Sequence, residues 1–316
     1  MLASLACFVT PATSHAQSYP DKPIRLIAPF PPGGGTDLMG HLISQHINRQ
    51  WGQPVVVENK PGANGMIGSE FVARAPADGY TLLVGTMGTH GINASLYRKL
   101  PYDTVADFAP ITELISSPMM LLVHPSVPAR SVKDFIALAK ARPGQLTFSS
   151  AGIGSVGHLA GEWFNAMAQV KTLHVPYKGS GPATVDLLSG HVQAMLGSPA
   201  AAAGFVKSNK VRALAVTSIK RSSLMPDIPT VAESGLRGYD VTTWYGLWAP
   251  AQTPRSIVSR WHGEIVRMLA LPSTTQQLST QGLEAVGNTP EQFAAQIKLE
   301  LQKWARVAAS AGIVPE

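Results

Sequence analysis

Cysteine is almost absent from this chain of 316 residues, in which Cys7 is the only one. Cys7 lies in an apolar run near the N-terminus, so cleavage after Ala16 would leave no cysteine. That excludes disulfides, thiol catalysis and cysteine metal sites from the processed chain. Long apolar runs are absent too. Beyond the first twenty or so positions, no stretch reaches the roughly 18 consecutive apolar residues of a membrane span, so none is predicted.

Charged residues are few, at 14%, while hydrophobic residues make up 45% of the chain, proportions typical of a globular protein. The 25 Lys and Arg residues outnumber the 19 Asp and Glu residues, for a net charge of +6. They are scattered, and the tightest basic cluster is only Lys220-Arg221. A nucleic-acid binder gathers its basic residues on one stripe, so we expect no nucleic-acid partner. The excess positive charge instead gives a weak general attraction for small anions.

The N-terminus has the pattern of an export signal. Leu2 to Val9 form a short apolar run, and Ser14-His15-Ala16 places small residues where signal peptidase cleaves. We therefore expect residues 1–16 to be a signal peptide, cleaved near Ala16, and the protein to be periplasmic. No Lys or Arg precedes the apolar run, which a start codon assigned too far downstream would explain. The alternative is a buried N-terminal helix.

Strands and helices alternate in two separate stretches of the chain. The first has strands at 24–28, 55–58 and 81–84 with helices at 38–50 and 70–74; the second has strands at 146–149, 172–175, 192–196 and 213–216 with helices at 156–168, 183–188 and about 204–206. Such alternation predicts a mostly parallel sheet with helices on both faces. The sequence therefore predicts two α/β lobes. Thr253 and Thr289 are each expected to cap a helix whose first residue is the following proline, and these two helices are expected to cover the first lobe.

Two glycine-rich loops each lie between a strand and a helix, at 31–37 and at 150–155. Glycine lets backbone N–H groups approach a ligand closely, and a helix N-terminus favours negative charge. The loops therefore predict a site that grips a small anion from both sides, unless each makes only a tight turn. Asp37, in the first helical turn, is equally well explained as a partner of the helix dipole. It could also meet an ammonium group of an amino-acid ligand.

Patterns for catalysis are incomplete. Gly152-Ile153-Gly154-Ser155-Val156-Gly157 has the spacing of a dinucleotide-binding loop, but no acidic residue that could hold a ribose follows the next strand. Ser155 lacks the glycine two residues before it that a nucleophile elbow requires. We therefore predict no catalytic residue, no cofactor and no metal. A secreted α/β enzyme that acts on a carboxylate or phosphate ester stays open as the alternative.

Several motifs occur in an order and spacing that are more specific than any one of them. They are Pro31-Pro32-Gly33-Gly34-Gly35-Thr36-Asp37, Lys60-Pro61-Gly62-Ala63-Asn64-Gly65, Ala77-Asp78-Gly79-Tyr80-Thr81-Leu82, Ser150-Ala151-Gly152-Ile153-Gly154-Ser155, Val175-Pro176-Tyr177-Lys178-Gly179 and Trp244-Tyr245-Gly246. Together they resemble the Bug (TctC-type) family of periplasmic solute receptors, which is associated with tripartite tricarboxylate transporters. The resemblance covers nearly the whole chain from Tyr19 onward.

The resemblance implies a two-lobed periplasmic-binding-protein fold, of the Venus-flytrap, type II-like kind. Each lobe would be a mostly parallel or mixed sheet flanked by helices. Lobe 1 would comprise residues 17–118 plus 247–316, and lobe 2 residues 119–246, with crossings near 117–119 and 243–249. A monomer is expected.

The resemblance also implies a carboxylate held by backbone N–H groups and hydroxyls of the two loops. The implied ligand-binding residues are Gly34, Gly35, Thr36 and Asp37 from lobe 1 and Ser150, Ala151, Gly154 and Ser155 from lobe 2, with Asn64, Gly65, Thr86, Tyr177 and Ser198 toward the far end of the ligand. The ligand could be a di- or tricarboxylate, an amino acid or an aromatic acid. A tripartite-type membrane permease or a sensor kinase would be the partner. The strand at 193–198 lacks the aspartate and aromatic residues that the family often has there, so no particular ligand is assigned.

Overall fold

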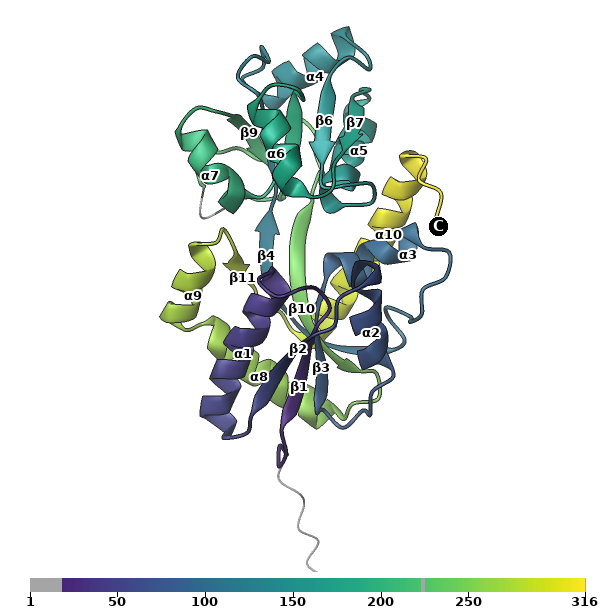
Figure 1. Ribbon diagram of the computed structural model, residues 1–316, viewed down its shortest axis with the longest axis vertical. Helices are drawn as coiled ribbons and strands as arrows, with labels where there is room; N and C mark the ends of the chain where they lie inside the picture. Colours follow the sequence, from purple (N-terminus) through teal and green to yellow (C-terminus); the bar gives the residue numbers. More distant parts are fainter. Residues whose placement is uncertain (1–18, 223–224, 316) are drawn as a thin grey trace, which may run out of the picture.

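The computed structural model describes residues 19–222 and 225–315, which form two α/β lobes connected by long strands (Figure 1). Each lobe contains one mixed sheet flanked by helices, so the fold class predicted from the sequence is confirmed. The predicted signal peptide at residues 1–16, with Cys7, lies outside the described residues. Within those residues, no helix combines the length and the apolar character needed to cross a membrane.

The sheet of the first lobe has the strand order β11-β4-β10-β3-β1-β2. Its strands are β1 (Ile24–Ala28), β2 (Val55–Asn59), β3 (Thr81–Thr86), β4 (Phe108–Pro118), β10 (Thr242–Pro250) and β11 (Glu284–Ala285). The helices are α1 (Gly35–Trp51), η1 (Ala63–Gly65), α2 (Met66–Ala73), η2 (Gly88–Ile92), α3 (Asn93–Leu96), α8 (Arg255–Leu269), α9 (Pro272–Ser279) and α10 (Pro290–Ser310). β1 pairs in parallel with β2 and β3, whereas β10 runs antiparallel to both β3 and β4.

The sheet of the second lobe has the strand order β7-β6-β8-β5-β9. Its strands are β5 (Met120–Val123), β6 (Thr147–Ser150), β7 (Leu173–Pro176), β8 (Ala194–Gly197) and β9 (Arg212–Val216). Its helices are α4 (Val132–Ala141), α5 (Val156–Ala168), α6 (Ser180–Leu188) and α7 (Pro199–Lys207). β6 pairs in parallel with β7 and β8, while β5 is antiparallel to its neighbours. In both lobes the glycine-rich loop follows a strand of the parallel part of the sheet.

Both faces of the first sheet are covered. Leu26 and Ile27 are adjacent in β1 and fully buried, yet they belong to different core clusters because successive strand residues point to opposite faces. The cluster around Leu26 includes Ile43 of α1 and Trp261 of α8. The cluster around Ile27 includes Trp304 of α10 and continues into the second lobe. Burial on both faces explains why β1 is apolar except at Arg25, which is partly exposed and pairs with Glu58 of β2.

The connections between the lobes meet at Thr217, which is fully buried. The hydroxyl of Thr217 accepts a hydrogen bond from the N–H of Met119, at 2.7 Å, between β4 and β5. The same hydroxyl donates to the carbonyl of Val241, at 2.5 Å, just before β10 begins. One side chain therefore ties both crossing segments together. From Thr242 onward β10 pairs with β4 of the first sheet, starting opposite Pro118.

The C-terminal helices pack differently from each other. α8 contacts α1 and β4 of the first lobe. α10 contacts β4, η2 and α3 of that lobe but also α5 of the second lobe, and in Figure 1 it runs along the side of the molecule from one lobe toward the other. Thr289 caps α10 as predicted and also forms a capping box with Gln292. The cap predicted at Thr253 is wrong: α8 starts at Arg255 with Pro254 at its N-cap position, and the Thr253 hydroxyl bonds no described residue.

Candidate ligand-binding site

The first glycine-rich loop is shaped by the carboxylate of Asp37. This carboxylate accepts hydrogen bonds from the N–H of Gly33 and from the side-chain amide of Asn59, both at 3.0 Å. The bond from Gly33, followed by that from Asn59, lowers the pKa of Asp37 below its ordinary value. Gly33 has a φ of 88°, which residues other than glycine rarely adopt. Asp37 therefore holds the loop in a turn that presents the start of α1.

The start of α1 has unpaired hydrogen-bond donors. Its N-cap residue is Gly34, which has no side chain to cap the helix. Within the described part of the chain, the N–H groups of Gly35 and Thr36 donate no hydrogen bond. The hydroxyl of Thr36 is buried as well and has no hydrogen-bond partner. A helix N-terminus carries a partial positive charge from the helix dipole. These donors together form a binding site for an anion, which would accept their hydrogen bonds.

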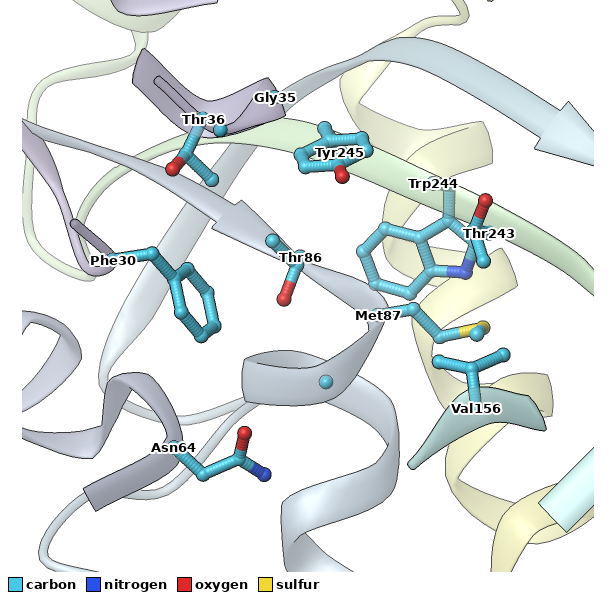
Figure 2. A pocket seen from close by; sticks show the side chains of 12 residues that line it. Phe30, Gly35, Thr36, Asn64, Thr86, Met87, Val156, Thr243, Trp244 and Tyr245 are labelled. Atoms are coloured by element: carbon cyan, nitrogen blue, oxygen red, sulfur yellow. The ribbon is translucent and has the colours of Figure 1, made fainter. Parts of the chain in front are cut away.

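A cavity of about 300 Å³ lies against the start of α1 (Figure 2). It is lined by Phe30, Gly34, Gly35, Thr36, Asn64, Thr86, Met87, Gly88, Val156, Thr243, Trp244 and Tyr245. In Figure 2, Thr36 and Tyr245 lie at one end and Asn64 at the other. No lining residue is acidic, basic or a histidine, so the charge that faces a ligand comes mainly from oriented backbone groups. Phe30, Met87 and Val156 contribute apolar side chains to its wall.

The far end of the cavity is built from paired polar side chains. The amide of Asn64 donates to the side chain of Asn93 at 2.7 Å, and the amide of Asn93 donates back to the Asn64 carbonyl at 3.1 Å. Asn64 has a positive φ of 51°. The hydroxyl of Thr86 accepts the N–H of Thr89 at 3.3 Å. The orientation of this end is therefore fixed by contacts within the first lobe.

The second glycine-rich loop is held by two stacked histidines whose rings are 3.9 Å apart. The N–H of Gly154 donates to Nδ1 of His158 at 3.1 Å, and the hydroxyl of Ser150 lies 2.7 Å from Nε2 of His174. Burial lowers the pKa of both histidines, and His158 nearby lowers that of His174 further, to about 4. His158 therefore acts as a neutral hydrogen-bond acceptor that supports the loop.

Helix α5 begins just after this loop. The hydroxyl of Ser155 caps it by accepting the N–H of His158 at 3.3 Å. The N–H groups of Val156 and Gly157 donate no hydrogen bond to any described residue. Val156 also lines the cavity. The loop also meets the first lobe: a Cβ added at Gly154 would lie 2.7 Å from Cδ1 of Leu96 in α3. The two lobes thus already touch beside the cavity.

The structure brings part of the predicted site together. The predicted residues Gly34, Gly35, Thr36, Asn64 and Thr86 line the cavity, whereas Asp37, Gly65, Ser150, Ala151, Gly154, Ser155, Tyr177 and Ser198 do not. Asp37, Ser150, Gly154 and Ser155 shape the two loops instead. The hydroxyl of Tyr177 donates to Asp186 at 2.5 Å, which raises the pKa of Tyr177 to about 12. Gly65, at a φ of 83°, precedes α2, and Ser198 precedes α7.

Other lining residues were missed from the sequence. They are Phe30, Met87, Gly88, Val156, Thr243, Trp244 and Tyr245. Three of these residues lie in β10, and the alternation of side chains along a strand is the signal that groups two of them: Thr243 and Tyr245 share one face. The hydroxyl of Thr243 is paired with the carbonyl of Ser117 at 2.7 Å.

A larger cavity, of about 800 Å³, lies between α10, the crossing strands and Trp163 of α5. It contains none of the ligand-binding residues predicted from the sequence. Its charges are mixed, with Glu113, Asp240 and Glu300 near Lys303 and Arg306. Burial raises the pKa of Glu113 to about 7. Across residues 19–222 and 225–315, no group of three or more His, Cys, Asp or Glu side chains is placed to hold a metal ion.

A cavity between two α/β lobes, at strand ends and helix N-termini, is the arrangement of a solute-binding receptor. Residues 41–313 match the family described as "Tripartite tricarboxylate transporter family receptor" (TctC), and the chain belongs to this family. It is 38% identical over 311 residues to the "UPF0065 protein in tcbD-tcbE intergenic region" of Pseudomonas sp. strain P51, covering 97% of this chain and 92% of that protein. It is 36% identical over 317 residues to BugT of Bordetella pertussis, covering 99% and 97%.

Solved structures show the same fold. The R. palustris protein Rpa4515, solved with adipate, is 36% identical with a TM-score of 0.79, covering 94% of this chain and 100% of that chain. MatC (Rpa3494) from Rhodopseudomonas palustris, solved with bound malate, is 32% identical with a TM-score of 0.74, covering 92% and 99%. The sequence-based resemblance to the Bug (TctC-type) family is therefore confirmed.

Proposed function

We propose that this chain captures a small carboxylate in the cavity between its lobes and presents it for uptake. The observation that carries the proposal is the start of α1, where the N–H groups of Gly35 and Thr36 and the buried Thr36 hydroxyl all lack partners. Unpaired buried donors are costly unless a ligand satisfies them. The absence of acidic residues from the lining also favours an anion. Adipate and malate in similar receptors support a carboxylate as the ligand.

We further propose that the second lobe completes the site when the lobes close. The free N–H groups of Val156 and Gly157 at the start of α5 lie on the lobe-2 side of the cavity. Closure would bring this second helix N-terminus toward the carboxylate held by α1. Ser150, Ala151, Gly154 and Ser155 would then act mainly by shaping the loop, with Gly65, Tyr177 and Ser198 further from the ligand.

The proposed lobes follow the two sheets. The boundary predicted after residue 246 falls inside β10, which pairs with β4 of the first sheet from Thr242 onward. We therefore place the second boundary before Thr242 and keep the first near Met119. Periplasmic location follows from the family. Cleavage near Ala16, a monomeric state and a tripartite-type permease as partner belong to the same proposal, with a sensor kinase as the alternative partner.

A thermal-shift screen tests the proposal. Malate, adipate, glutamate and benzoate would each be compared with their neutral amides, because a ligand that binds only the folded state raises its melting temperature. We expect at least one acid, and not its amide, to stabilise the protein. If no carboxylate does so at millimolar concentration, the proposal is wrong. Consumption of a stabilising acid, or of its ester, during prolonged incubation would instead favour the secreted-enzyme alternative.

A further inference from the structure

The ring of Tyr245 packs directly against the start of α1. A Cβ added at Gly35 would lie 2.7 Å from Cζ of Tyr245 and 2.8 Å from its hydroxyl oxygen. Real Cβ atoms do not approach other atoms so closely, so the phenol can occupy this position only because residue 35 is glycine. The tyrosine hydroxyl is thus placed beside the unpaired N–H groups of the first helical turn.

The hydroxyl of Tyr245 is itself unpaired. No hydrogen bond joins it to any residue of the described parts of the chain, although the side chain lines the cavity. Burial raises the pKa of Tyr245, so the group keeps its proton throughout the physiological range. It is therefore a permanent O–H donor. Thr36 offers a second buried hydroxyl without a partner at the same end of the cavity.

The backbone fixes the direction of this side chain. Tyr245 lies in β10, paired with Thr86 of β3 on one side and with Ile115 of β4 on the other. The pairing of β10 with β4 shifts between Tyr245 and Gly246. Such bulges re-aim a side chain and are common beside functional sites. A tyrosine held in this way loses little freedom when it binds a ligand.

We propose that Tyr245 determines specificity for a carboxylate by donating its O–H to the ligand oxygen that also accepts the N–H groups of Gly35 and Thr36. The inference rests on the proposed function. Three donors that converge on one oxygen favour a carboxylate over a carboxamide, because hydrogen bonds to an ionised acceptor are roughly twice as strong as those to a neutral carbonyl.

The test is Tyr245→Phe, measured by titration calorimetry with adipate, malate and adipamide. Removing only the hydroxyl is expected to weaken the acid that binds wild type about tenfold or more, as for other hydrogen bonds to charged groups. Binding of adipamide should change only about threefold, because a hydrogen bond to a neutral oxygen contributes roughly half as much free energy as one to a charged oxygen. The preference for acid over amide should therefore shrink.

Tyr80→Phe is the matched control, because the Tyr80 hydroxyl bonds Asp21 at 2.6 Å, away from the cavity. It should leave the affinity unchanged, and circular dichroism should show both variants folded. If folded Tyr245→Phe binds the acid as tightly as wild type, or if acid and amide weaken equally, the inference is wrong while the proposed function stands. If wild type binds neither adipate nor malate nor any other carboxylate of the screen, the proposed function fails, and this inference fails with it.

Discussion

Replacing Gly35 with alanine should damage ligand binding without unfolding the protein. The new Cβ would lie 2.7 Å from Cζ of Tyr245, whereas ordinary contacts of this kind lie at 3.4–4 Å. The phenol must therefore move by about 0.7 Å or more, and it can do so because it is the far end of a side chain. Alanine favours a helix over glycine by up to about 1 kcal/mol, which offsets part of the strain.

The displacement of the Tyr245 hydroxyl determines the expected loss of ligand affinity. A hydrogen bond to a charged group contributes about 1.5–3 kcal/mol, so moving the Tyr245 hydroxyl away should weaken acid binding roughly 10- to 100-fold. In the Tyr245→Phe background the same Gly35→Ala change should cost less, because the two residues act on one contact. Calorimetry with the acid that binds wild type measures all three variants.

Gly34→Ala is the matched control for Gly35→Ala. A Cβ at Gly34 would meet only the carbonyl oxygen of Pro31, at 3.8 Å, and its φ of −89° suits any residue. Its effect on binding should therefore be several-fold smaller than that of Gly35→Ala. Equal affinity of Gly35→Ala and wild type, with both folded, would refute the placement of the anion beside Tyr245.

Three further predictions concern the stability of the fold, the first glycine-rich loop and cleavage of the N-terminus. Burial lowers the pKa of His90 from 6.5 to about 3, so the unfolded chain gains a proton between pH 7.5 and 4.5 that the folded chain does not. In urea unfolding, the free energy of unfolding of wild type should fall by about 2–3 kcal/mol more than that of His90→Phe over this interval, because the buried histidine destabilises the fold as pH falls below 6.5. Equal decreases in the two proteins would contradict the burial of a neutral imidazole. Asp37→Ala leaves the N–H of Gly33 without its acceptor and Asn59 with only the Phe30 carbonyl, so it should lower the free energy of unfolding in urea by about 1–3 kcal/mol and weaken acid binding; unchanged values for both would show that the loop does not depend on this carboxylate. Mass spectrometry of the exported protein should find an N-terminus at Gln17, and an exported chain that keeps Met1 would disprove the cleavage site.

The local elements were predictable from the sequence because their signals are local. Helix α5 occupies Val156–Ala168 as predicted, since Ser155 caps it and its apolar residues recur at helical spacing. Strand β1 likewise matches 24–28, a segment that is apolar except at Arg25 and that leads into a glycine-rich turn. The position of both loops at helix N-termini followed from the same signals.

The cavity itself was only partly predictable, because its wall depends on contacts between distant segments. Tyr245 meets Gly35 only through the pairing of β10 with β3. Conversely, the donors of the second loop looked free in the sequence, yet Gly154 and Ser150 are bonded to His158 and His174. Tyr177 is similarly paired with Asp186. In this chain these polar groups support the shape of the second lobe's loops, and the sequence alone does not show their partners.

A crystal structure of the complex with the acid that gives the largest thermal shift tests the central claim most directly. We expect one carboxylate of the ligand in the cavity of Figure 2, within about 3 Å of the N–H groups of Gly35 and Thr36. The N–H groups of Val156 and Gly157 should lie closer to it than they do without ligand. A ligand bound in the larger cavity beside Glu113 and Lys303, or a carboxylate that avoids the start of α1, would contradict the account.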